Sequence, residues 1–180
     1  MTTDRVGADG MSADVTGAGI AGVAWEIVSS PAPVIAATQL EREQRLVAER
    51  ALTDGPPVAL IWQSEPALVV TQSERYLPCF EEAARIAAAE GWPVSVRSTG
   101  GSAVAMGPGV VNVGLILPWR VTRPTLEEGF RLICAPLIGA LARFGVTATT
   151  GSAPGSYCDG RFNVLAGSRK IAGTSQRHVM

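Results

Sequence analysis

The chain has 180 residues and a mass of 18.7 kDa, which favours a single domain whose core needs no disulfide or metal to hold it. Apolar residues make up 47% of the sequence and charged residues 17%, a composition that excludes wholesale disorder. The net charge of −1 gives no support for a surface that binds nucleic acid or an anionic membrane. No apolar run is long enough to span a bilayer.

The first 22 residues and the three cysteines bear on domain limits and location. Residues 1–22 are rich in glycine and lack the apolar segment of a secretory signal, so we expect a disordered leader before a domain over residues 23–180. Cys79, Cys134 and Cys158 form no Cys-x-x-Cys pair and are odd in number. They are typical of reduced cytoplasmic thiols and predict neither a disulfide framework nor a metal site.

The first half of the chain predicts a helix, two strands and a second helix. The periodicity favours a helix over residues 31–52, strands over 58–63 and 67–71, and a helix that opens at Pro78 and ends before Gly91. The side chains expected to face inward from the two helices are Ala36, Leu40, Val47, Ala51, Phe80, Ala83, Ala84 and Ala87.

The second half adds strands, one long helix and a hairpin. Residues 94–98 and 103–105 predict strands around a glycine turn, and a strand over 110–117 should be interrupted by Gly114. A long helix is expected after Thr122, kinked at Pro136. A short strand after Gly145, a loop over 151–161 and a hairpin of 162–166 with 169–172 complete a mixed α+β fold. We expect a largely antiparallel sheet with helices on one face.

The glycine turn is the first candidate site. In Arg97-Ser98-Thr99-Gly100-Gly101-Ser102-Ala103, the paired glycines let main-chain N–H groups approach an anion or a carbonyl oxygen closely. The Arg97 guanidinium would add a fork of donors. A plain hairpin turn is the alternative.

Lys170 is the second candidate. It is the only lysine beside 14 arginines, and a compact ammonium on a slim stem is what arginine cannot replace. On a strand that lines a pocket, its ammonium would neutralise a developing oxyanion. Chance composition and a solvated surface position are the alternatives.

Cys158 is the third candidate. It lies in the polar, glycine-flanked segment Gly155-Ser156-Tyr157-Cys158-Asp159-Gly160, where a thiol would be accessible to substrate. Neighbouring cations would favour the reactive thiolate. Cys79 and Cys134 sit among apolar residues and are expected to be buried, and a spare loop cysteine is the alternative for Cys158.

Together these segments resemble the lipoate–protein ligase and octanoyltransferase superfamily. The segment from Arg97 to Val104, followed by Gly107-Pro108-Gly109-Val110-Val111-Asn112, is similar to its glycine-rich acyl loop. The segment from Gly167 to Gln176 is similar to its lysine motif, and residues 60–70 with Arg75 resemble its N-terminal strand pair. The resemblance covers the chain from about Trp25 onward.

The resemblance implies an α+β fold akin to biotin ligases and class II synthetases, with a site for octanoyl or lipoyl groups. Members place these groups on a lysine of a carrier protein, such as a lipoyl domain or a glycine-cleavage H-like protein. Lys170 would bind the acyl carbonyl or an adenylate phosphate. The acyl- and substrate-binding residues that it implies are Arg97, Thr99, Gly100, Gly101, Ser102, Ala103, Asn112 and Gly173.

The segment around Cys158 bears on the branch. Gly155 to Cys158, followed by Gly160 and Phe162, is similar to the amidotransferase branch, in which a loop cysteine takes the acyl group as a thioester without ATP. The ligase branch uses ATP and magnesium and shows Asn-Asp-Leu before the lysine motif, where this chain has Phe162-Asn163-Val164. An octanoyl transferase is therefore favoured, with an ATP-dependent ligase as the alternative. Family domains extend past the lysine motif, so we also expect a domain incomplete at its C-terminal end, and a non-catalytic acyl-binding fragment is a third possibility.

Overall fold

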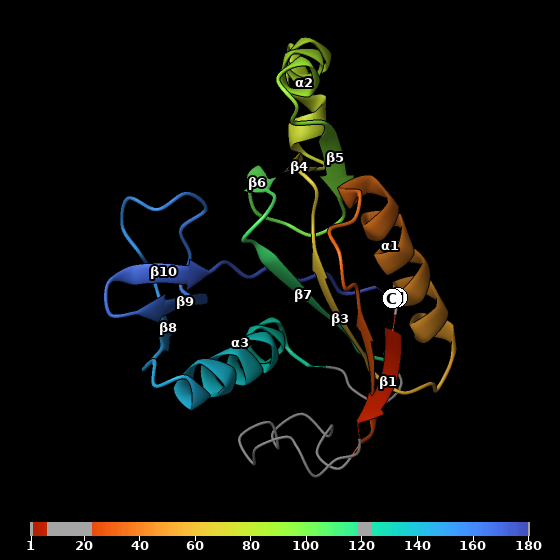
Figure 1. Ribbon diagram of the computed structural model, residues 1–180, viewed down its shortest axis with the longest axis vertical. Helices are drawn as coiled ribbons and strands as arrows, with labels where there is room; N and C mark the ends of the chain where they lie inside the picture. The colour runs from red at the N-terminus through yellow and green to blue at the C-terminus, as the bar shows by residue number, and fades with distance from the viewer. Residues whose placement is uncertain (1, 7–22, 119–123, 180) are drawn as a thin grey trace.

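A computed structural model describes residues 2–6, 23–118 and 124–179 (Figure 1). Its helical elements are α1 (Ala36–Leu52), the short 3-10 helix η3 (Glu74–Tyr76), α2 (Phe80–Ala89) and α3 (Leu126–Arg143). Its strands are β1 (Thr2–Val6), β2 (Trp25–Ser29), β3 (Val58–Gln63), β4 (Ala67–Thr71), β5 (Val94–Arg97), β6 (Val104–Met106), β7 (Val111–Ile116), β8 (Thr149–Gly151), β9 (Asn163–Ala166) and β10 (Arg169–Ala172).

The strands form three small sheets, with the orders β1-β2-β3-β7, β5-β4-β6 and β10-β9-β8. Among the described strands, β2 with β3 and β4 with β5 pair in parallel, and the other pairs are antiparallel. The mixed, mostly antiparallel α+β fold predicted from the sequence is therefore confirmed.

The first sheet is covered by a helix on each face, which corrects the expectation that all helices lie on one face. Side chains alternate along a strand, so Val58, Leu60 and Trp62 of β3 share one face, where Leu46 and Val47 of α1 pack. On the opposite face, Ala59 packs with Trp25 and with Leu132 of α3. Figure 1 places α1 and α3 on either side of β3 and β7. The apolar pattern of a helix predicts that one of its faces is buried, but not the sheet face that buries it.

Several local boundaries also differ from the sequence prediction. The first helix begins at Ala36 and not at Pro31, because residues 30–34 run beside β3: Ser30 N–H donates to Ile61 O and Val34 N–H to Gln63 O. Strand β7 continues through Gly114, which pairs with Leu60. The third helix continues through Pro136, and its start at Leu126 lies after the undescribed residues 119–123.

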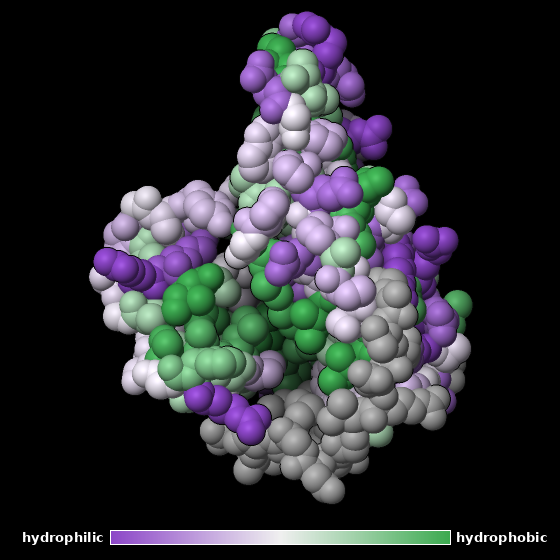
Figure 2. Space-filling model, viewed as in Figure 1, coloured by the Kyte–Doolittle hydropathy of each residue, from purple (hydrophilic) through white to green (hydrophobic). Residues whose placement is uncertain are grey.

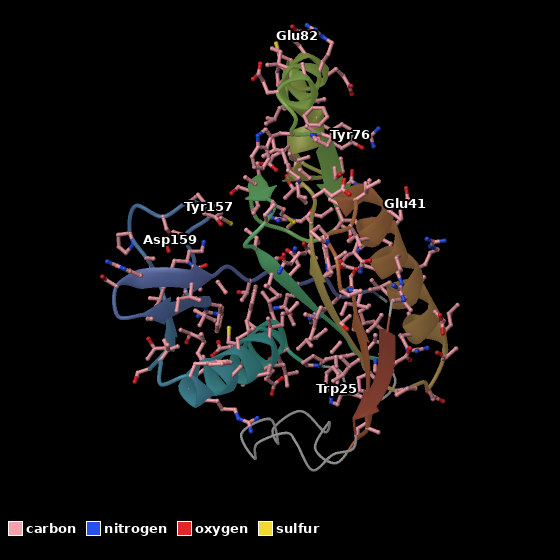
Figure 3. The ribbon with its side chains drawn as sticks, viewed as in Figure 1. Trp25, Glu41, Tyr76, Glu82, Tyr157 and Asp159 are labelled. Atoms are coloured by element: carbon pink, nitrogen blue, oxygen red, sulfur yellow. The ribbon has the colours of Figure 1, made fainter. Side chains whose placement is uncertain are left out.

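The predicted inward face of α2 is only partly buried. No residue of α2 is buried, and the helix extends away from the sheets at the top of the molecule, where Figure 3 labels Glu82. Of the four residues predicted to face inward, Phe80, Ala84 and Ala87 are half-buried and Ala83 is exposed, and the helix contacts β5.

The predicted disordered leader also needs correction at its start. Residues Thr2–Val6 form β1, which pairs antiparallel with β2 along its whole length. Residues 7–22 of the same predicted leader lie outside the described residues. None of the helices in the described ranges has both the length and the apolar character that a bilayer crossing requires.

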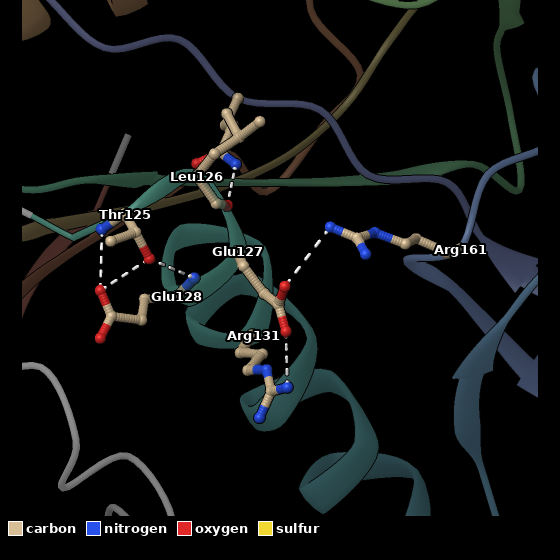
Figure 4. Close-up of polar contacts among 7 residues, drawn as sticks. Thr125, Leu126, Glu127, Glu128, Arg131 and Arg161 are labelled. Carbon is tan, nitrogen blue, oxygen red and sulfur yellow. Dashed lines mark hydrogen bonds and ion pairs between the residues drawn. The ribbon is translucent and has the colours of Figure 1, made fainter.

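The start of α3 is fixed by its own side chains and tied to the loop that follows β8. Thr125 and Glu128 form a reciprocal capping box, in which Thr125 Oγ1 accepts from Glu128 N–H and the Glu128 carboxylate accepts from Thr125 N–H (Figure 4). Glu127 pairs with Arg131 at 2.7 Å and with Arg161 at 3.4 Å. The capped end of α3 thus anchors Arg161, the last residue of the predicted loop over 151–161.

Candidate functional site

The glycine segment joins two strands that do not pair with each other. Strand β4 lies between β5 and β6, with β5 parallel and β6 antiparallel to it. The alternative of a plain hairpin turn at Gly100-Gly101 is therefore excluded, and residues 98–103 form a loop that crosses from one side of β4 to the other. We call residues Thr99–Ala103 the glycine loop.

Cys158 lies against this loop. A Cβ added to Gly101 would lie 3.2 Å from Cys158 Sγ and 2.7 Å from Arg97 Nη2, so the thiol and the guanidinium both approach the same glycine Cα. Gly101 has a φ of +110°, in the region that favours glycine. Cys158 is exposed and has a φ of 47°, a left-handed conformation that is uncommon for a residue with a side chain and is often found at functional sites.

Lys170 holds the main chain on both sides of the thiol. Its ammonium donates to Tyr157 O at 2.8 Å and to Cys158 O at 3.1 Å, and it lies 4.6 Å from the centre of the Tyr157 ring. Tyr157 and Asp159 lie in the upper part of the β8–β10 lobe (Figure 3). The ammonium has three N–H donors, so these two carbonyls leave one for another acceptor.

Arg97 supports the glycine loop from inside the protein. It is 9% exposed, and its Nη2 donates to Gly100 O and to Ser102 O, both at 2.9 Å. Its Nε has no partner among the described residues. Burial lowers the pKa of Arg97, while the nearby Cys158 and Glu74 oppose that shift, and the guanidinium remains charged.

Glu74 holds the far end of the same loop and was not predicted from the sequence. Its Oε1 accepts from Ala103 N–H at 2.8 Å, and its Oε2 accepts from Thr71 N–H at 2.8 Å. Hydrogen bonds from Thr71 N–H and then Ala103 N–H, together with the charge of Arg97, lower the pKa of Glu74, so the carboxylate is ionised at neutral pH. The Thr-x-x-Glu pattern of residues 71–74 is the sequence signal for the local part of this arrangement.

Asp159 organises the loop that carries Cys158. Its carboxylate accepts from the Ser152 hydroxyl, from Ala153 N–H at 2.7 Å and from Asn163 Nδ2 at 3.1 Å. These bonds, that of Ser152 foremost, lower the pKa of Asp159. The carboxylate therefore ties the residue after Cys158 to both ends of its loop.

The remaining predicted site residues divide into two groups. Thr99 Oγ1 accepts from the Ser175 hydroxyl at 3.0 Å, and a Cβ added to Gly173 would lie 3.4 Å from Lys170 Nζ, so both residues adjoin the site. Asn112 lies elsewhere in the sheet: it is paired with Trp62, on the face that α1 covers, and its Nδ2 has no hydrogen-bond partner among the described residues. Its acyl-binding role stays a prediction.

The three cysteines are all free, but they differ in accessibility. Cys134 is buried in α3, as expected, and burial raises its pKa. Cys79 is exposed at the start of α2, which corrects the expectation that it is buried. The apolar neighbour Phe80 is itself only half-buried, so its presence did not predict the burial of Cys79.

Comparison with known proteins identifies the domain. The family model described as the lipoyl protein ligase A/B catalytic domain matches residues 36–180. The chain belongs to this family. The resemblance inferred from the glycine loop and the lysine motif is confirmed, and so is the class of fold that it implied.

The curated relatives of this lipoyl ligase A/B domain include three bacterial proteins named octanoyl-[GcvH]:protein N-octanoyltransferase. That of Kyrpidia tusciae is 36% identical over 84% of this chain and 52% of its own length. That of Geobacillus kaustophilus is 35% identical over 68% of this chain and 43% of its own length. That of Anoxybacillus flavithermus is 32% identical over 68% of this chain and 44% of its own length. The chain thus spans about half the length of the curated relatives that it matches.

Solved structures share the fold at low sequence identity. A lipoate-protein ligase A bound with ATP has a TM-score of 0.67 at 15% identity and covers 86% of this chain and 61% of its own. A protein of T. acidophilum with bound lipoic acid has a TM-score of 0.61 at 17% identity, over 86% of this chain and 62% of its own. These likenesses concern the fold of the lipoyl ligase A/B domain alone.

Proposed function

We propose that this domain transfers an octanoyl group from one carrier protein to the lysine of another, through a thioester on Cys158. The observation that carries the proposal is the position of the exposed Cys158 thiol, which approaches Gly101 beside Arg97, while Lys170 binds the main-chain carbonyl of the same cysteine. The names of the curated relatives support the same chemistry. Both the activity and the partners are proposals for this chain.

Two balanced steps make up the transfer. In the first, the Cys158 sulfur attacks the acyl carbonyl of the octanoyl amide on the donor carrier. The carbon–nitrogen bond breaks, and the donor lysine amine leaves with a proton. In the second, the amine of the acceptor lysine attacks the thioester, the carbon–sulfur bond breaks, and the thiol regains its proton as the new amide forms. Splitting the transfer in this way replaces one difficult step with two easier ones.

Lys170 and Arg97 supply positive charge to both steps. The free donor of the Lys170 ammonium would bind the acyl oxygen as negative charge develops on it, a contribution worth about 3 kcal/mol in comparable sites. The Arg97 guanidinium, held near Gly101, would add positive charge beside the sulfur as the acyl group is transferred. Arg97, Thr99, Gly100, Gly101, Ser102, Ala103 and Gly173 would form the wall of the acyl site.

An apolar surface is available for the acyl chain. Ile61 of β3 and Val111 and Val113 of β7 are exposed on the sheet face opposite α1. In Figure 2, apolar side chains gather in the hollow between the β8–β10 lobe and this sheet. Each methylene buried there would contribute about 0.8 kcal/mol, so part of an octanoyl chain would add a few kcal/mol to binding.

The residues fit the transferase better than the ATP-dependent ligase. A magnesium–nucleotide site needs a carboxylate that can face the phosphates. In the ligase branch that residue precedes the lysine motif, and this chain has Asn163-Val164 there. Asn163 instead donates to Asp159, whose carboxylate is already bonded to Ser152 and Ala153. We therefore propose that transfer needs neither ATP nor magnesium, and that it takes place in the cytoplasm, where thiols stay reduced.

The test is a transfer assay between two carriers. The chain is incubated with an octanoylated glycine-cleavage H-like protein and an unmodified lipoyl domain, with and without ATP and magnesium, and the lipoyl domain is weighed by mass spectrometry. Octanoylation without ATP is the expected result. Modification that requires free octanoate, ATP and magnesium would support the ligase, and acyl binding without turnover would support a non-catalytic fragment.

A further inference from the structure

Within the described residues, Glu74 is an ionised side chain that holds the glycine loop from outside the segments predicted to form the site. It lies 29 residues before Ala103, yet its Oε1 accepts the Ala103 N–H at 2.8 Å. Its other oxygen is used at the start of η3, where Thr71 N–H and Thr71 Oγ1 both donate to it. Each carboxylate oxygen therefore has a separate main-chain N–H group to satisfy.

Arg97 and Glu74 hold the loop from two sides. Arg97 Nη2 binds the carbonyl oxygens of Gly100 and Ser102, and in a planar trans peptide the N–H of the following residue points the opposite way. The N–H that follows Ser102 O is that of Ala103, which Glu74 accepts. The N–H that follows Gly100 O belongs to Gly101, and it has no hydrogen-bond acceptor among the described residues. This N–H group belongs to the glycine that Cys158 Sγ approaches.

We propose that Glu74 is a positioning residue for acyl transfer. Its carboxylate fixes the Ser102–Ala103 peptide and so orients the glycine loop, whose Gly101 N–H donates to the acyl oxygen when Cys158 attacks. The inference rests on the proposed thioester chemistry at Cys158. It assigns a second oxyanion donor, beside the Lys170 ammonium, to the loop main chain, and it assigns the orientation of that donor to a residue from η3.

Glu74→Gln separates this role from the local capping of η3. Gln and Glu both serve in a capping box, so η3 can keep its cap. The Thr71 and Ala103 N–H groups lie at different oxygens of the carboxylate, however, so the single oxygen of the amide cannot accept from both. If the oxygen caps η3, the amide nitrogen faces the Ala103 N–H and the loop loses its acceptor. Glu81→Gln is the matched control, because Glu81 is exposed in the first turn of α2.

The test compares two reactions of the same thiol. Octanoyl-N-acetylcysteamine acylates Cys158 through an oxyanion, whereas iodoacetamide alkylates it by direct displacement without one. Loss of a single oxyanion donor costs about 100- to 1,000-fold in rate, and misorientation of that donor should cost about 10- to 100-fold. We expect Glu74→Gln to slow acylation by this factor and to leave alkylation as fast as in the wild type, because alkylation forms no oxyanion. Glu81→Gln should change neither rate.

The other outcomes overturn the proposal and are distinguishable from failure of the proposed function. Equal acylation by Glu74→Gln and wild type would remove Glu74 from the mechanism. A parallel fall in both rates would reduce it to a structural residue of the fold. Amide hydrogen exchange gives a second measure: exchange at Ala103 should accelerate about tenfold or more in the variant, and unchanged exchange contradicts the proposed contact. If wild-type Cys158 is alkylated but never acylated, it is the thioester chemistry itself that fails.

Discussion

Gly101→Ala tests the packing at the centre of the site, because the same added methyl group meets both Arg97 and Cys158. A φ of +110° is unfavourable for any residue with a side chain, at a cost of about 1–3 kcal/mol. The new Cβ would also lie 2.7 Å from Arg97 Nη2 and 3.2 Å from Cys158 Sγ. A contact of 2.7 Å would force either the loop or Arg97 to move. Arg97 is buried, and its guanidinium is hydrogen-bonded to two loop carbonyls.

Gly100→Ala is the matched control one residue earlier. A Cβ there meets nothing within 4 Å, and Gly100 does not have a positive φ. We expect Gly101→Ala to destabilise the protein by about 3 kcal/mol, from backbone strain and from weakened bonds of Arg97. In a chain of this length that corresponds to a fall in Tm of about 6–12 °C. Gly100→Ala should stay within about 2 °C of wild type, since Gly to Ala in open space also restricts the unfolded chain.

The assay is a thermal melt of both variants, followed by acylation of Cys158 at a temperature where both are folded. Gly101→Ala should also lose most acylation, because the methyl group displaces the thiol or the guanidinium beside it. Equal melting temperatures and equal acylation rates for the two alanine variants would refute the close approach of Cys158 and Arg97 to Gly101.

Four further outcomes follow from single contacts. Lys170→Ala should lower acyl transfer by at least about 100-fold with little change in Tm. Lys170→Arg should not restore transfer, because a planar guanidinium does not replace a compact ammonium. The transfer rates of the soluble variants check both expectations. Burial raises the pKa of Glu43, whose carboxylate accepts from Trp62 Nε1. Glu43 therefore stabilises the fold below its ordinary pKa and loses that contribution as pH rises. Glu43→Gln should raise Tm more at pH 7 than at pH 4.5. The pKa of Asp159 is lowered instead, so its contribution is present above the ordinary carboxyl pKa and is lost as pH falls below it; the Tm difference between wild type and Asp159→Asn should shrink in acid. Thr125→Ala removes the cap of α3 and should cost about 1 kcal/mol in denaturant unfolding.

The segments with local signals were predictable from the sequence. Both strands around Glu65-Pro66 were predicted at their observed bounds, and the positive φ of Gly167 in the last hairpin follows from its turn sequence. The three candidate segments with Cys158, Lys170 and the glycine pair also meet in space. Their proximity was an implication of the family resemblance, since no spacing rule relates residues 97–103 to 158.

What the sequence did not reveal depends on contacts between distant segments. The strands over residues 58–63 and 67–71 are neighbours in the chain but belong to different sheets. The apolar periodicity of α2 predicted a buried face, and the described structure buries that face only in part. Glu74 binds Ala103, which lies 29 residues later in the chain, and only its local Thr-x-x-Glu pattern was visible in the sequence. Hydrophobic periodicity gives the orientation of an element about its own axis, whereas its partner is fixed by the path of the whole chain.

The most direct test of the proposed chemistry is to trap the acyl group on the enzyme. The chain is mixed with an octanoylated carrier in the absence of ATP and of any acceptor, digested under mildly acidic conditions, and mapped by peptide mass spectrometry, with Cys158→Ser as the control. We expect one octanoyl adduct, on Cys158 and not on Cys79 or Cys134, that hydroxylamine removes and that the serine variant lacks. An adduct that forms only with ATP, or transfer at the wild-type rate by Cys158→Ser, would contradict a thioester mechanism at this cysteine.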